Sequence, residues 1–323
     1  MPDMPHPAAK WAVVSTIKAP TEDILAFAAH HLDLGAHRLY LYLDDENPEA
    51  NAALKAHPKI RVTQTDETYW RRHGTRPEKH QVRQTANVMN AYTKKAHEVD
   101  FITHIDVDEF LWPSRDLGAQ LADLPQSASC ARVWPIEALS SEGQNAPDGI
   151  TWFKSCARNR QSRLKQTAKL YPTYGTYLNG GYLSHAMGKL FIRTGIDGLK
   201  IRIHNVFLGQ DTNPGLVILE ETELCHLHAK NWDSFRAAFR YRHAKGSYRD
   251  ELSANTAKDG TGLNLHQLFT TILDAEGEDG LRAFFNEVCL ATPDLRAALD
   301  RKGHLRSIAL DLPAKRARHF PRA

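Results

Sequence analysis

Apolar runs of strand length alternate with helical patterns over the first third of the chain. Strands are predicted at 11–17, 38–43, 60–65 and 101–105, and helices at 21–34, 50–56 and 80–98. This alternation is typical of a parallel sheet with helices on both faces and right-handed crossovers. The pattern therefore predicts an α/β fold with a mostly parallel sheet flanked by helices.

Three local features are expected within this pattern. Thr21 is placed to cap the first helix, and residues 70–72 (Trp-Arg-Arg) are expected in a loop. The long helix 80–98 is expected to pack its apolar positions inward, namely Val82, Ala86, Met89 and Ala96.

Polar side chains follow three of the predicted strands where each strand ends. Because parallel strands end at one edge of a sheet, we expect these side chains to converge there, although they are distant in sequence. They are Thr16, Lys18, Asp44, Asp45, Asp106 and Asp108.

The segment 100–113 (DFITHIDVDEFLWP) places three acidic residues between two apolar runs. In an extended chain, Asp106 and Asp108 point to the same side. Adjacent carboxylates repel each other, and a divalent cation removes the penalty of burying them; Mg²⁺ is commonly held by one or two carboxylates plus phosphates. The segment therefore predicts a metal–diphosphate site at a strand end. The alternative is a solvated loop, because an isolated Asp-x-Asp pattern is common.

The second half of the chain is less regular. Strands are predicted at 130–138, 189–193, 200–204 and 217–228, a polar loop at 139–149 and an amphipathic helix at 231–245. The basic residues between 158 and 169 are interpreted as a solvated face rather than an acceptor site. We expect one domain at 1–245 and a mostly helical C-terminal extension at 246–323. The basic tail 315–322 is either disordered, which we favour, or a peripheral contact with an anionic membrane.

Composition narrows the class of protein. The hydrophobic fraction of 42% with 24% charged residues is ordinary for a globular chain, and the net charge of +3 argues against a nucleic-acid binder. The four cysteines are widely spaced, which favours reduced thiols. With no signal-peptide pattern and no apolar stretch of membrane-spanning length, a cytoplasmic location is expected, with the inner membrane face as a peripheral alternative.

The stretch HIDVDEFL, residues 104–111, resembles the Asp-x-Asp-Glu-Phe-Leu signature of family 2-like glycosyltransferases with a GT-A fold. Further similarities follow the family order between about residues 11 and 245. They are LYLDD at 41–45, Arg83-Gln84, HAMGK at 185–189 with Arg193, HNV at 204–206, and CHLHAK at 225–230. The loop after Asp45 departs from the family because it lacks the usual Ser-x-Asp.

This resemblance implies metal-dependent transfer of a sugar from a nucleotide-sugar donor to a hydroxyl of a glycan or lipid-linked acceptor, as in surface polysaccharide or glycoconjugate synthesis. Mn²⁺ or Mg²⁺ would be held by Asp108 first, by Asp106, and by His226 as a distal ligand. The residues implied in binding the donor are Thr16, Lys18, Asp44, Asp45, Arg83, Gln84, Asp106, Lys189 and Arg193. Inverting transfer also needs a general base, for which Glu142, Asp148 and His185 are candidates. The oligomeric state is left open.

Each assignment has an alternative. His226 and His228 fit alternating buried histidines of a strand, or more weakly a zinc site; Asp44 and Asp45 fit a simple turn; and Lys189 fits a solvated strand residue. Two other functions also remain. A nucleotidyltransferase would normally have a glycine-rich loop after the first strand, which residues 15–20 lack. A non-catalytic protein that binds nucleotide sugars or polysaccharides could use the same fold.

Overall fold

A computed structural model describes residues 7–244 and 263–321, and they form two compact units. Within the described residues, unit 1 comprises 7–134, 187–224 and 311–321, and unit 2 comprises 135–186, 225–244 and 263–310. The predicted domain boundary at 245/246 falls outside the described residues and stays a prediction. None of the helices in the described ranges combines the length and apolar composition that crossing a bilayer requires.

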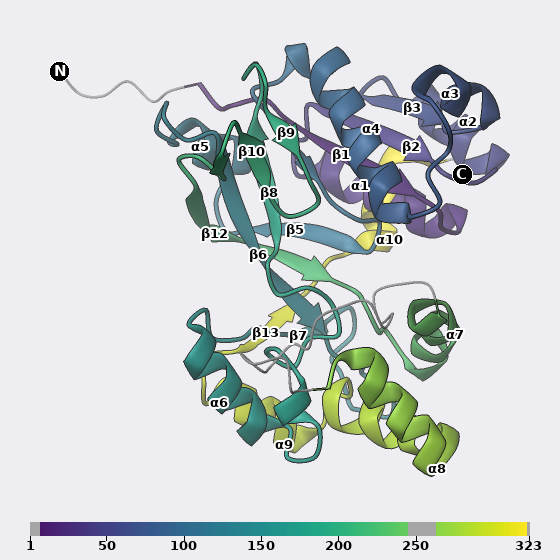
Figure 1. The fold of residues 1–323 in the computed structure, drawn as a ribbon, viewed down its shortest axis with the longest axis vertical. Helices are drawn as coiled ribbons and strands as arrows, with labels where there is room; N and C mark the ends of the chain where they lie inside the picture. The colour runs from purple at the N-terminus through teal and green to yellow at the C-terminus, as the bar shows by residue number, and fades with distance from the viewer. Residues whose placement is uncertain (1–6, 245–262, 322–323) are drawn as a thin grey trace. The chain divides into compact units, whose positions relative to one another are not determined.

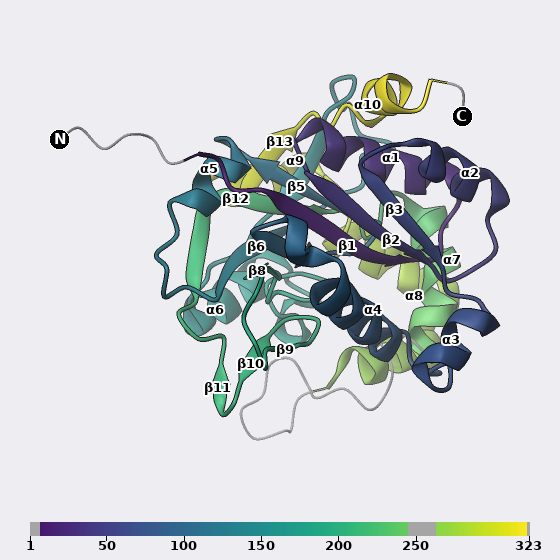
Figure 2. The same ribbon diagram turned by 90° about the horizontal axis from the view of Figure 1, so that it is seen from above.

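Unit 1 is built on a sheet whose strand order is β6-β8-β4-β1-β2-β3 (Figure 1). Strands β1 (Trp11–Ile17), β2 (Arg38–Leu43), β3 (Ile60–Gln64) and β4 (Phe101–His104) are parallel to one another. Strands β8 (Lys189–Arg193) and β6 (Cys130–Ala138) continue the sheet antiparallel. Figure 2 shows α1 (Thr21–Asp33) and α2 (Pro48–Ala56) on one side of β1–β3 and α4 (His80–Lys94) on the other. The predicted α/β fold class is confirmed.

Short elements complete unit 1. They are α3 (Glu67–His73), the 3₁₀ turn η1 (Ala96–Glu98), β5 (Glu109–Pro113), α5 (Leu117–Ala122), β9 (Lys200–Ile201), β10 (Val206–Leu208), β11 (Asp211–Thr212) and β12 (Val217–His226), which continues into unit 2. β12 pairs with β5 and β6. The strand predicted at 200–204 is β9, which is only two residues long.

Two predictions about the helices near the sheet are wrong. The hydroxyl of Thr21 caps no backbone amide and instead donates to Asn47 and Glu49. Residues 70–72 belong to helix α3, not to a loop, because Asp66 caps the amide of Tyr69 and Trp70 is buried at 3% exposure.

The inward face of α4 differs in part from the prediction. Val82 is 49% exposed, whereas Met89 packs against the apolar core and Ala96, in η1, is buried as predicted. The buried residues of α4 itself are Arg83, Gln84, Asn87, Val88 and Ala91. The first turns of α4 bury polar side chains because each of them has a hydrogen-bond partner at a strand end, which offsets their desolvation.

The basic tail is folded over residues 312–319, where disorder was expected. Helix α10 (Leu312–His319) packs against α1. Lys315 is buried with its Nζ 3.2 Å from Nδ1 of His30, and Arg318 forms a bidentate pair with Asp33. The tail cations therefore have partners within unit 1.

Unit 2 contains the end of β6 with β7 (Thr151–Lys154) and β13 (Leu305–Ile308), paired antiparallel. Its helices are α6 (Arg160–Leu170), α7 (Trp232–Ala244), α8 (Leu265–Val288) and α9 (Pro293–Asp300), with a 3₁₀ turn η2 (Gly175–Tyr177). Phe235, Phe239, Phe269, Phe284 and Phe285 form the centre of its core. The C-terminal extension is mostly helical as predicted, apart from β13; residues 246–262 lie outside the described residues.

Candidate functional site at the strand edge of unit 1

Helix α4 connects the ends of three parallel strands through three side chains on one face. Asn87 donates to Thr16 Oγ1 on β1 (2.9 Å), and Arg83 Nε donates to Asp44 Oδ2 after β2 (2.8 Å). Gln84 donates a short hydrogen bond to Oδ1 of Asp106 after β4. Three of the six strand-end side chains expected to converge are thus held by one helix, namely those of Thr16, Asp44 and Asp106.

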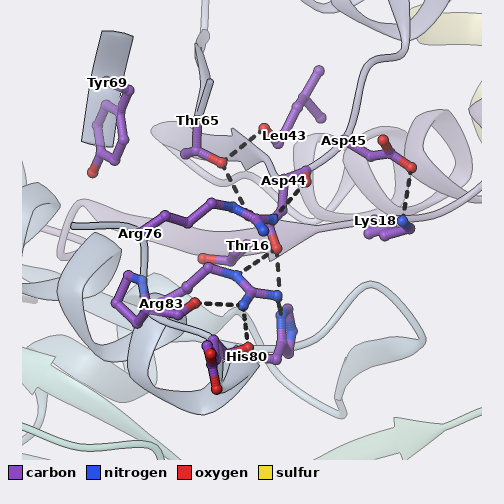
Figure 3. Close-up of polar contacts among 12 residues, drawn as sticks. Thr16, Lys18, Leu43, Asp44, Asp45, Thr65, Tyr69, Arg76, His80 and Arg83 are labelled. Carbon is purple, nitrogen blue, oxygen red and sulfur yellow. Dashed lines mark hydrogen bonds and ion pairs between the residues drawn. The ribbon is translucent and has the colours of Figure 1, made fainter. Parts of the chain in front are cut away.

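Asp44 lies at the centre of the first part of this edge (Figure 3). Besides Arg83, its carboxylate accepts from Arg76 (3.1 Å) and Thr65 (3.2 Å), and His80 Nδ1 lies 3.7 Å away. Burial alone would raise the pKa of Asp44, but the imidazole of His80 and the guanidinium groups of Arg83 and Arg76 lower it to about 2. The carboxylate is therefore ionised and surrounded by more positive than negative charge.

Asp106 forms the second part of the edge. Its Oδ2 lies 2.7 Å from Lys189 Nζ, which also contacts Glu109 Oε2 at 3.1 Å. Glu109 in turn accepts from the backbone N–H of Asp106 (2.7 Å). Burial opposes the charged forms, but these pairings lower the pKa of Asp106 and raise that of Lys189. Lys189 is therefore a buried ion-pair partner and not a solvated strand residue.

The backbone between β4 and β5 is a turn, not an extended chain. The N–H of Glu109 donates to the carbonyl of Asp106 (3.0 Å), and residues 107 and 108 form the turn. Asp106 and Asp108 therefore do not follow the strand alternation that the sequence led us to expect. Asp106 keeps 35% of its side chain exposed, and Asp108 is partly exposed.

His104 is buried on β4, two residues before Asp106. Burial and the charge of Lys189 lower the pKa of His104 to about 3, so the ring is neutral. Neither ring nitrogen has a hydrogen-bond partner among the described residues.

Other predicted residues lie outside this network. Lys18 and Asp45 form an exposed ion pair at 3.1 Å beside it. Arg193 lies at the opposite end of β4, paired with Phe101, because β8 runs antiparallel to β4. Its guanidinium donates to the carbonyls of Ala128 and Pro125. The structure does not bring Arg193 to the edge where Lys189 lies.

The remaining candidates belong to unit 2. His226 and His228 are buried, with ring centroids 5.0 Å apart in an edge-to-face arrangement. Asp148 and His185 are exposed. Glu142 pairs with Arg282 (2.8 Å) and accepts from the backbone N–H of Trp232 (2.8 Å). The amide of Trp232 and the guanidinium of Arg282 lower the pKa of Glu142.

Sequence reasoning missed several residues of the edge. They are Thr65, Arg76, His80 and Asn87. A signal was present for two of them, since positions 80, 83, 84 and 87 are all polar and share one face of a helix. Arg76 had no such signal, because it lies in the segment between α3 and α4.

The fold and this polar edge define an α/β protein with a candidate ligand site at the carboxyl ends of parallel strands. The family model of glycosyltransferase family 92 matches residues 14–259, most of the chain. The chain belongs to glycosyltransferase family 92. The prediction of a glycosyltransferase is confirmed at that level, while the family differs from the family 2-like enzymes that the motifs resemble.

Two solved structures match the chain at low similarity. HddC from Yersinia pseudotuberculosis is 9% identical, with 72% of this chain and 99% of that chain covered and a TM-score of 0.38. The 4-diphosphocytidyl-2C-methyl-D-erythritol synthase is 15% identical, with 43% and 68% covered and a TM-score of 0.27. No curated protein sequence matches the chain.

Proposed function

We propose that this glycosyltransferase transfers a sugar from a nucleotide-sugar donor to an acceptor hydroxyl, and that the donor binds at the strand edge of unit 1. The observation that carries the proposal is the side-chain network from α4 to Thr16, Asp44 and Asp106 in a chain of glycosyltransferase family 92. Such a network holds polar groups in place before a ligand arrives, which reduces the cost of ordering them on binding.

In this proposal Asp44 contacts the nucleoside part of the donor. Because the Asp44 side chain is 1% exposed and already accepts from Arg76 and Thr65, the donor takes the place of one of these partners. The low pKa of Asp44 keeps it an acceptor at neutral pH. Arg83 has 10% of its side chain exposed and serves to fix Asp44, whereas Arg76 has 48% exposed and contacts the diphosphate.

We propose Asp108 as the main ligand of a divalent ion, with His226 as a distal ligand. Asp108 offers a hard oxygen ligand on a turn at the strand edge, and the mixed carboxylate–imidazole set suits Mn²⁺ better than Mg²⁺. Asp106 is already paired with Lys189, so we assign it to anchoring the turn, with a contact to the metal or ribose as its secondary role. When bound, the ion supplies Lewis-acid stabilisation of the departing diphosphate.

For inverting transfer, the general base is proposed among Asp148 and His185 rather than Glu142. The ion pair of Glu142 with Arg282 and its lowered pKa make this carboxylate a weaker base. Proton NMR of the product's anomeric centre would establish inversion or retention.

The test is donor hydrolysis over a panel of nucleotide sugars with Mn²⁺. We expect release of nucleoside diphosphate, reduced about a hundredfold or more in Asp108→Asn. The matched control is Asp123→Asn, which should retain wild-type activity. Asp123 is an exposed carboxylate of unit 1 that pairs with Arg115.

Binding of Mn²⁺ followed by electron paramagnetic resonance gives a readout independent of turnover, and Asp108→Asn should weaken it. Release of pyrophosphate from a nucleoside triphosphate and a sugar phosphate would instead indicate a nucleotidyltransferase. Donor binding without turnover of any donor would indicate a binding protein.

A further inference from the structure

A hollow with a volume of about 470 Å³ lies in unit 1 between β3, α2 and the end of α4. Its lining includes Tyr40, Lys55, Arg61, Lys94, Lys95 and Glu98. These positions lie near the starts of the parallel strands and the end of α4, so the hollow is at the opposite end of the sheet from Asp44 and Asp106.

The hollow is lined by four cations that form no ion pair within the described ranges. They are Lys55, Arg61, Lys94 and Lys95. Arg61 donates only to the backbone carbonyls of Pro58 and Ile60.

The single acidic side chain in the lining, Glu98, already has other partners. Glu98 forms an ion pair with Arg38 at 3.0 Å and accepts from the hydroxyl of Tyr40 at 3.0 Å. The local charge of the hollow is therefore strongly positive.

The positive charge of the hollow affects the ionisation of Lys95. Its Nζ donates to Thr63 Oγ1 at 3.1 Å and lies 5.0 Å from the ring centroid of Tyr42. Partial burial and the charge of Lys94 lower the pKa of Lys95. An anion in the hollow would relieve this repulsion.

Two structural effects account for some of these cations but not for their convergence. Lys55 and Lys94 lie in the last turns of α2 and α4, where the helix dipole favours a cation. Charged residues on an edge strand such as β3 also discourage unwanted strand pairing, but only Arg61 lies on the strand itself. Neither effect requires cations from α2, β3 and α4 to line one hollow.

We propose that this hollow binds clustered phosphate groups, such as those of a phosphorylated lipid head group or of a free polyphosphate. Arginine and lysine in this arrangement provide a forked donor and point charges for several phosphate oxygens at once. The site is separate from the proposed donor site and does not depend on it.

The test compares wild type with Lys55→Gln/Lys94→Gln. Both side chains are exposed and make no hydrogen bond or ion pair in the described structure, so the fold should be retained. The control is Lys165→Gln/Lys169→Gln, which removes the same charge from exposed positions of α6 in unit 2. Circular dichroism checks folding of both variants.

Binding is measured without metal or nucleotide, by calorimetry with inorganic tripolyphosphate and by sedimentation with vesicles of phosphatidylcholine containing or lacking phosphatidylinositol 4,5-bisphosphate. We expect the Lys55/Lys94 variant to lose about tenfold or more in affinity while the control is unchanged. Loss with both probes, or with tripolyphosphate alone, supports a site for free polyphosphate; loss with vesicles alone supports a lipid head group. Equal binding by all three proteins, or no binding by wild type, would overturn the proposal.

Discussion

Lys189 Nζ lies 2.7 Å from Asp106 Oδ2, across 83 residues of sequence. The same ammonium group contacts Glu109 at 3.1 Å, so one buried lysine compensates two carboxylates of the acidic segment. From sequence alone, the closeness of the acidic side chains predicts a divalent ion, whereas in the structure the ammonium group of Lys189 compensates Asp106 and Glu109. We still propose a divalent ion, but the reason is the ligand oxygen of Asp108 and not repulsion between carboxylates within the segment.

Replacing Lys189 with methionine should lower the stability of the folded protein. The substitution leaves Asp106 and Glu109 close together without their cation, and breaking a buried pair typically costs about 3–5 kcal/mol. Because Asp106 keeps 35% of its side chain exposed, we expect the lower end, about 3 kcal/mol. The loss in free energy of unfolding is measured by urea titration with circular dichroism as the signal. Lys200→Met, at an exposed position of unit 1, should change stability by less than about 0.5 kcal/mol; an equal loss in both variants would contradict the role of Lys189.

Asp44 should make stability depend on pH in the acid range. Its folded pKa of about 2 is below its ordinary value of 3.8, so the unfolded chain binds a proton more readily than the folded one. The contribution is fully present above about pH 4 and is lost as the pH falls toward 2. A shift of this size corresponds to roughly 2 kcal/mol. Urea midpoints between pH 5 and 3 should fall less steeply in Asp44→Asn than in wild type, and parallel slopes would refute this prediction.

Arg83 should be sensitive even to a substitution that keeps its charge. It donates to Asp44 and to the carbonyls of Pro77 and Glu78, so it ties the segment before α4 to the end of β2. Arg83→Met should destabilise by about 3 kcal/mol because it leaves the buried Asp44 with less compensation. Arg83→Lys should recover less than half of the stability lost in Arg83→Met, because an ammonium group cannot reproduce the forked hydrogen bonding of a guanidinium group. Denaturant unfolding of both variants measures this, and full rescue by lysine would show that charge alone matters.

Helix α10 should be required for the stability of unit 1. Ending the chain after residue 310 removes α10, which packs against α1, and the buried Phe320. Burial of Phe320 alone corresponds to about 2–3 kcal/mol, so thermal and urea midpoints should both fall clearly. Arg318→Gln, which breaks only the exposed pair with Asp33, should cost less than about 1 kcal/mol. A truncated chain as stable as wild type would mean that the helix is dispensable.

Local sequence determined the order of strands and helices and the polar residues at the strand ends. Those features follow from periodicity over a few residues, so β1, β2, β6 and β8 match their predicted bounds. Only the tertiary structure decided which polar groups are buried together. The inward face of α4 is polar because Thr16, Asp44 and Asp106 lie opposite it, and no pattern within the helix states what it faces. Likewise, Lys189 reaches Asp106 and Arg193 does not, since β8 runs antiparallel to β4 and its two ends lie at opposite edges of the sheet.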